Sequence, residues 1–156
     1  SHILLGFIFS LFLFLFFRQI SLLEATIVFL SSFLIDIDHY LMYFIKEKNL
    51  SLKKAYKQNY ELDKKFLYLP RKQRNRFYIS ICPLHGFEIL LIILILSIFI
   101  SKYFFFVFIG FTFHLILDVI NQKINYTDRF DRLSIIYDFF DYKKLKRFRM
   151  QKHKKW

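Results

Sequence analysis

The sequence places nine histidine and acidic side chains within or beside long apolar runs. Ionisable groups are costly in a membrane, so such residues are candidates for a functional site. His114 and Asp118 are four residues apart, and Asp36 and His39 are three apart, spacings that put each pair on one helix face. The full set is His2, Glu24, Asp36, Asp38, His39, His85, Glu88, His114 and Asp118.

Imidazole and carboxylate groups in combination are typical ligands of transition metals. They suit Zn, Mn or Fe, and inward-projecting pairs at helical spacing build metal sites within helix bundles. The set offers more ligands than the three or four that one zinc ion needs. A two-ion site would clamp the attacking and leaving oxygens of a phosphoester.

The elements that must position these residues are four apolar runs. The chain has 156 residues, 56% hydrophobic and 23% charged, so apolar and charged residues must be segregated. This composition excludes a disordered chain, and a single cysteine, Cys82, excludes a disulfide framework. We expect an all-α integral membrane protein, a single domain (1–156) built as a bundle of about four transmembrane helices. The expected spans are 2–17, 20–45, 84–101 and 103–121.

The basic residues predict the orientation. The stretch 46–76 has 11 Lys/Arg and 3 Asp/Glu, and the stretch after Asn121 has 11 and 4. Both would be cytoplasmic by the positive-inside rule, as a connector (46–83) and a tail (122–156), with both termini on that side of the cell membrane. Eight of the nine candidate residues would then lie near the cytoplasmic face. Glu24 is the exception, and we interpret it as an interface residue.

The connector is expected to contain an amphipathic helix on the membrane surface, capped by Ser51 and ended by Pro70. Lys46–Arg76 and Lys143–Lys155 would attract anionic lipid head groups, although topology control alone also explains them. No nucleic-acid motif appears, so no specific nucleic-acid partner is expected. Cys82 is interpreted as inert packing.

Four short motifs resemble, in order, those of the YdjM-like family of membrane-bound metal-dependent hydrolases. Asp36-Ile37-Asp38-His39 resembles that family's P-D-I-D-H motif, and His2-Ile3-Leu4-Leu5 its N-terminal G-H-L-L. His85 matches the second histidine of the family's H-R-G-x-T-H-S motif, whose first histidine and arginine are absent here. His114-Leu115-Ile116-Leu117-Asp118 matches its H-x-x-x-D segment. The resemblance implies a helical membrane fold, a divalent-metal centre and hydrolase activity.

The leading hypothesis is hydrolysis of a phosphoester, such as a phospholipid or a lipid-linked phosphate, at the cytoplasmic face. Asp36 or Glu88 would accept a proton from the attacking water. Arg132, with Arg129, would bind the phosphate, unless the two arginines pair with neighbouring aspartates. The cofactor would be one divalent ion or two, Zn before Mn or Fe. Its ligands would be His2, Asp38, His39, His85, His114 and Asp118.

Two other functions remain open. A divalent-metal transporter or sensor would need ligands through the bilayer, and only Glu24 lies on the far side. A non-enzymatic lipid-binding membrane protein would act through the two basic stretches alone. The sequence leaves the oligomeric state undetermined.

Overall fold

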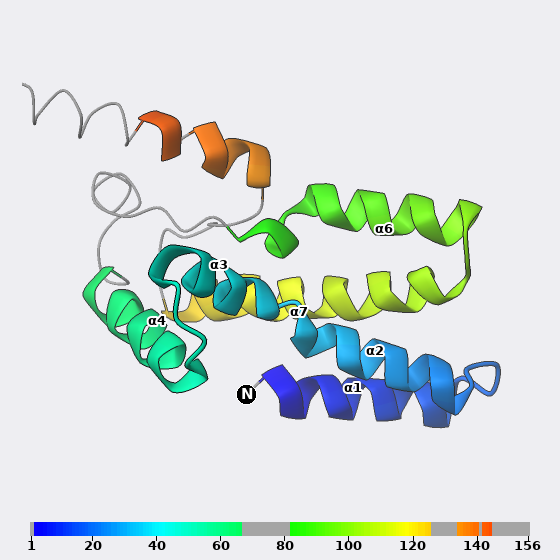
Figure 1. The fold of residues 1–156 in the computed structure, drawn as a ribbon. Coiled ribbons are helices and arrows are strands. Elements are labelled where there is room, and N and C mark those ends of the chain that lie inside the picture. Colours follow the sequence, from blue (N-terminus) through cyan, green and yellow to red (C-terminus); the bar gives the residue numbers. More distant parts are fainter. Residues whose placement is uncertain (1, 67–81, 126–133, 141, 145–156) are drawn as a thin grey trace, which may run out of the picture. The chain divides into compact units, whose positions relative to one another are not determined.

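The computed structural model describes residues 2–66, 82–125, 134–140 and 142–144. Every regular element in these ranges is helical, which confirms the expected all-α class (Figure 1). Short helical segments occupy 135–140 and 142–144. The main elements are α1 (His2–Phe16), α2 (Leu22–Leu34), α3 (Ile37–Glu47), α4 (Leu52–Phe66), the 3₁₀ helix η1 (Pro83–His85), α6 (Phe87–Phe99) and α7 (Tyr103–Asn125).

The chain forms two compact units. Unit 1 contains Ser1–Ile37 and Phe87–Asn121, and unit 2 contains Asp38–Gly86 and Gln122–Trp156. Only Arg18 and Lys102 of the 24 basic residues belong to unit 1. The segregation expected from composition is therefore also a division between units. The single-domain assignment stays a prediction.

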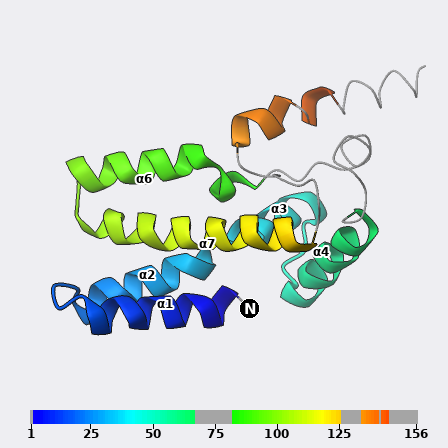
Figure 2. The same ribbon diagram turned by 180° about the vertical axis from the view of Figure 1, so that it is seen from behind.

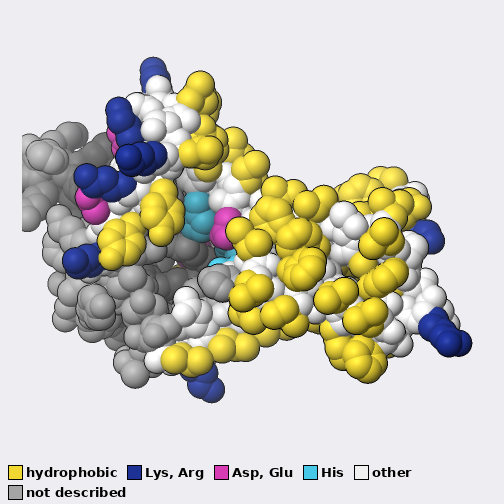
Figure 3. Space-filling view, turned by 90° about the horizontal axis from the view of Figure 1, so that it is seen from below, with side chains coloured by type: hydrophobic (Ala, Val, Ile, Leu, Met, Phe, Trp, Pro, Cys, Tyr) yellow, Lys and Arg dark blue, Asp and Glu magenta, His cyan; other side chains and the backbone are white. Residues whose placement is uncertain are grey.

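Two helical stretches, Leu22–Glu47 and Tyr103–Ile124, are long and apolar enough to cross a membrane. They suggest membrane association. The other apolar helices, α1 and α6, are shorter, with 15 and 13 residues. Large hydrophobic side chains are exposed along both of them, and Figure 3 shows such side chains forming most of the surface over α1 and α2.

The second apolar run, expected as one helix over 20–45, is interrupted by a turn at 35–36 between α2 and α3. In an unbroken helix the Asp36 N–H would bond to the Ser32 carbonyl, four residues back. Here it donates to the Phe33 carbonyl at 3.2 Å instead. Ile35 is fully buried, which fixes the turn in place. The interruption leaves the Ser32 carbonyl to another donor.

Small residues let α1 and α7 approach α2 closely within unit 1. The three helices lie side by side from both directions (Figures 1 and 2). Gly6 of α1 faces Ser32, and Gly110 of α7 faces Ser31 and the Val28 carbonyl. Close backbone approach at small residues is a common way to pack apolar helices where burial from water contributes little. Phe9 and Phe113 add a stacked pair, with ring centroids 4.1 Å apart.

Glu24 has a structural role at the start of α2. Its carboxylate accepts hydrogen bonds from the Ser21 N–H at 2.8 Å and from the Ser21 hydroxyl at 2.9 Å, as part of a capping box. Lys102 Nζ, in the α6–α7 connection, donates to it at 2.9 Å. This hydrogen bond raises the pKa of Lys102 above its ordinary value, so the pair stays ionic at neutral pH.

The connector forms α4 in unit 2, close to where the sequence pattern placed it. The Ser51 hydroxyl accepts from the Lys54 N–H at 3.3 Å, which confirms Ser51 as its cap. Gln58 donates to Glu47 at 3.0 Å and the Tyr40 hydroxyl to the Leu50 carbonyl at 2.7 Å, which ties α4 and its loop to α3. Pro70 lies outside the described residues.

Gly110→Ala is expected to destabilise unit 1 by about 1–3 kcal/mol, as overpacking does. The added Cβ would lie 2.6 Å from the Val28 carbonyl oxygen, a backbone atom that no substitution removes. Gly6→Ala would meet mainly the Ser32 hydroxyl, so Ser32→Ala should restore most of its lost stability. The unfolding free energies of the purified wild type, of Gly110→Ala, of Gly6→Ala and of the Gly6→Ala/Ser32→Ala double variant are to be compared. Equal stability of Gly110→Ala and wild type would refute the close contact.

Glu24→Ala is expected to lower the unfolding free energy, because it removes the acceptor of the Ser21 N–H and hydroxyl in the capping box. Lys102→Met should lower it less, because the Lys102 side chain is 71% exposed and exposed ion pairs contribute little. Denaturant unfolding of both variants compares them. A larger loss in Lys102→Met than in Glu24→Ala would contradict the capping role.

Candidate metal centre

His114 is a fully buried side chain of α7 and is held from one side by the backbone of α2. Its Nδ1 lies 2.7 Å from the Ser32 carbonyl oxygen. A carbonyl only accepts hydrogen bonds, so Nδ1 must carry the hydrogen and Nε2 is the nitrogen with the lone pair in the neutral ring. Histidines that bind metals commonly donate their other N–H to a backbone carbonyl in this way.

Two carboxylates and a second imidazole surround this nitrogen. Asp36 Oδ1, from the α2–α3 turn, and Asp118 Oδ2, one helical turn beyond His114, each lie 3.5 Å from His114 Nε2. The other oxygen of Asp118 lies 3.6 Å from His2 Nε2 at the start of α1. The rings of His2 and His114 have centroids 4.8 Å apart. We call these four residues of unit 1 the His114 cluster.

The spacing in the His114 cluster is compatible with a cation between the groups. An imidazolium would donate to a carboxylate at about 2.7–3.2 Å, whereas both separations are 3.5 Å. Ligand atoms about one tetrahedral ion, with bonds of about 2.0–2.2 Å, lie about 3.3–3.6 Å apart. Lone-pair donors that converge at this distance repel one another unless a proton or a metal cation compensates them.

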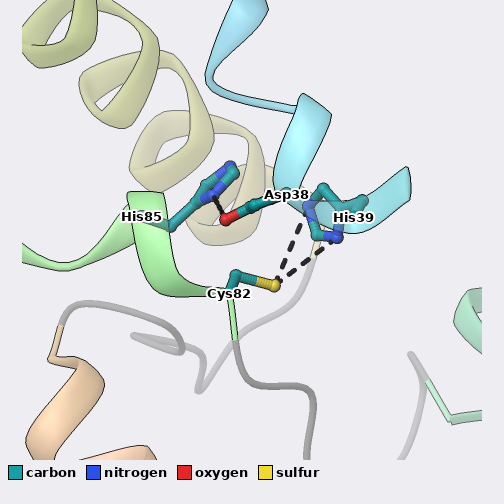
Figure 4. Close-up of side chains that lie close together, drawn as sticks. All are labelled: Asp38, His39, Cys82 and His85. Carbon is teal, nitrogen blue, oxygen red and sulfur yellow. Dashed lines mark hydrogen bonds and ion pairs between the residues drawn. The ribbon is translucent and has the colours of Figure 1, made fainter. Parts of the chain in front are cut away.

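A second group lies in unit 2, where Asp38 joins two segments distant in sequence. Asp38 is in the first turn of α3, and its Oδ2 accepts from the Leu84 N–H and from His85 Nδ1, each at 3.0 Å. Cys82 Sγ lies 3.5 Å from His39 Nδ1 (Figure 4). We call Asp38, His39, Cys82 and His85 the Cys82 cluster.

The Cys82 cluster could hold a metal ion. Each of its residues offers one ligand atom, and these atoms all lie within 4.8 Å of one another. Three of the four residues are buried, and His39 is half-buried. A carboxylate, two imidazoles and a thiol together form a donor set that zinc accepts.

The predicted site residues thus fall into two groups, one in each unit. His2, His114 and Asp118 meet in unit 1 with Asp36, the predicted base. Asp38, His39 and His85 meet in unit 2. Glu88, the other predicted carboxylate, is half-buried in the first turn of α6. Arg129 and Arg132 lie outside the described residues.

Sequence reasoning missed two participants. Cys82 was interpreted as packing, although a cysteine three residues before His85 was a local sign that it could lie near the candidate ligands. The Ser32 carbonyl is a backbone group, so no residue type could have marked it. Its role depends on the turn at 35–36.

No protein-family model, curated protein or solved structure matches this chain. Membership of the YdjM-like family therefore stays a prediction. The functional argument depends on the two clusters.

Removing metal is expected to destabilise the purified chain, and zinc should restore it. An ion bound at 100 times its dissociation constant adds about 2.7 kcal/mol per site. His114→Gln should lose one such increment together with one equivalent of metal, measured by thermal unfolding and elemental analysis. His153→Gln is the matched control, because it replaces a histidine that belongs to neither cluster. Full metal content in His114→Gln would contradict the site.

Proposed function

We propose that this chain is a membrane-bound metal-dependent hydrolase of phosphoesters. The observation that carries the proposal is the His114 cluster. A buried imidazole, set in one tautomer by the Ser32 carbonyl, faces two carboxylate oxygens at 3.5 Å with a second imidazole beside it. The H-x-x-x-D pair at its centre is also the motif that the resemblance to YdjM-like hydrolases connects with this chemistry.

The residues of the His114 cluster divide into ligands and a base. His2, His114 and Asp118 form a three-ligand set, the number that catalytic zinc sites use while keeping one position open. Asp36 borders the same position and has the most exposed of the carboxylates, at 46% against 23% for Asp118. It is therefore the group placed to accept a proton from the attacking water. A bound divalent ion supplies the Lewis acidity and the activated water; zinc fits this set, with Mn and Fe as alternatives.

A lipid phosphate is the proposed substrate class, because the chain also has a helix suited to a membrane surface. Leu52, Tyr56 and Tyr60, four residues apart on α4, are exposed, with lysines interleaved. An apolar stripe among lysines is suited to the interface of an anionic membrane. Arg132 stays a proposed phosphate-binding residue.

The membrane arrangement belongs to the same proposal. The two candidate spans would be joined by α1 and α6 to make four crossings. The 22 basic residues outside unit 1 would lie in the cytoplasm with both termini. Lipid head groups would be the partners of Lys46–Arg76 and Lys143–Lys155.

The position of Glu24 argues against a metal transporter. It is the one acidic residue expected on the far side of the membrane, and Ser21 and Lys102 already occupy its carboxylate. A transport path would need ligands there. Two alternatives remain. A metal sensor would bind metal without hydrolysing a substrate, and a non-enzymatic protein would bind lipid without hydrolysing it.

The zinc-loaded full chain should hydrolyse a short-chain phospholipid or a chromogenic phosphodiester. Asp36→Asn should lower kcat by about 10²–10⁴-fold, as loss of a general base does, while metal content stays unchanged. His114→Gln should lose both activity and metal. Glu61→Gln, an exposed carboxylate-to-amide change on α4, is the matched control.

Two outcomes would defeat the hydrolase assignment. One is a fully metal-loaded wild type that turns over neither substrate class. The other is an Asp36→Asn variant with wild-type kcat, which would remove the base from the mechanism.

A further inference from the structure

Asp38 organises the Cys82 cluster through one of its two oxygens. Oδ2 receives both the Leu84 N–H and His85 Nδ1, so these two donors fix the plane of the carboxylate. The side chain is only 2% exposed. Within the described part of the chain, its other oxygen, Oδ1, is buried and has no hydrogen-bond partner. A buried acceptor without a donor is destabilising, and each such atom calls for an explanation.

The thiol of Cys82 lies against the imidazole of His39. Sγ is 3.5 Å from Nδ1 and 4.0 Å from Nε2, so the edge of the ring that carries both nitrogens faces the sulfur (Figure 4). Cys82 is 3% exposed. Sulfur, imidazole nitrogen and a carboxylate oxygen therefore gather in one buried place.

We propose that Cys82, His39 and Asp38 bind a zinc-class ion, with Cys82 as a thiolate ligand and Asp38 ligating through Oδ1. His85 is the positioning residue, because its Nδ1–H holds Oδ2 and leaves Oδ1 for the ion. Ligand atoms about a tetrahedral zinc lie about 3.3–3.8 Å apart when one of them is sulfur. The ligand atoms of the Cys82 cluster lie within 4.8 Å of one another. This upper bound is about 1 Å longer than the spacing around a bound zinc, and rotation of the side chains covers the difference. Binding releases the thiol proton to solvent.

The types of ligand atom determine which ions this site binds. Thiolate and imidazole favour Zn²⁺ and its spectroscopic substitute Co²⁺, whereas Mg²⁺ and Ca²⁺ take oxygen ligands. A nucleophilic Cys–His pair is the rival use of the same two side chains. It requires access for a substrate, and a thiol that is 3% exposed does not provide it.

This site shares no assigned ligand with the proposed hydrolase centre. Its three ligands belong to unit 2, and the ligands and base of the His114 cluster belong to unit 1. Each can be removed by substitution without altering a ligand of the other. Failure of one proposal is therefore distinguishable from failure of the other.

Cobalt titration of the chelator-treated full chain tests the proposal directly. The sequence contains a single cysteine, so any thiolate-to-cobalt absorption band in the near ultraviolet reports on Cys82. We expect this band to appear, to saturate at one Co²⁺ per chain, and to be displaced by Zn²⁺ but not by excess Mg²⁺. Cobalt binding without the band would overturn the proposal, and this measurement needs no variant that must fold.

Variants identify the companion ligands. His39→Gln and Asp38→Asn should each weaken the cobalt affinity reported by the band at least about tenfold. His114→Gln should keep the band while losing phosphoester hydrolysis. Unchanged affinity in both His39→Gln and Asp38→Asn would overturn the assigned ligand set. Loss of the band in His114→Gln would assign the thiolate to another site and overturn the proposal as well.

Discussion

The hydrogen bond from His114 to the Ser32 carbonyl is the interaction on which the His114 cluster depends. It requires that the Ser32 carbonyl be released from the helix, which the turn at 35–36 achieves by moving the Asp36 N–H to Phe33. It also requires that α7 approach α2 closely, which Gly110 permits one helical turn before His114. The turn at 35–36 also brings Asp36 to the Nε2 side of the His114 imidazole, opposite the Ser32 carbonyl. One interruption of a helix thus supplies both an orienting acceptor and a carboxylate.

The Cys82 cluster uses the same physical device with the roles exchanged. In the His114 cluster a backbone carbonyl fixes an imidazole and leaves its second nitrogen to the site. In the Cys82 cluster a backbone N–H and an imidazole fix a carboxylate, and its second oxygen stays buried. Groups held at one atom lose little further freedom when the other atom binds an ion, which is the advantage of a preorganised outer shell.

Much of the candidate site was predictable because it depends on local spacing. The pairing of His114 with Asp118 follows from helix geometry, and the Ser51 cap from residue type. The turn at 35–36 was not predictable, because neither Gly nor Pro marks it and its acceptor is used by a histidine 82 residues away. The contact of Cys82 with His39 was not predictable for a similar reason, since the two residues are 43 apart in the chain.

Three properties could be read from the amino-acid sequence: the helical class, the segregation of basic from apolar residues, and the side chains with metal-binding chemistry. These properties depend on composition and on the 3.6-residue period, which act over a few neighbouring residues. The grouping of the candidates depends on the folded chain: His2 lies with Asp36, His114 and Asp118, and Asp38 lies with His39, Cys82 and His85. That grouping arises from helix packing and from one displaced backbone hydrogen bond, and both join residues too far apart in the chain for a local pattern to record.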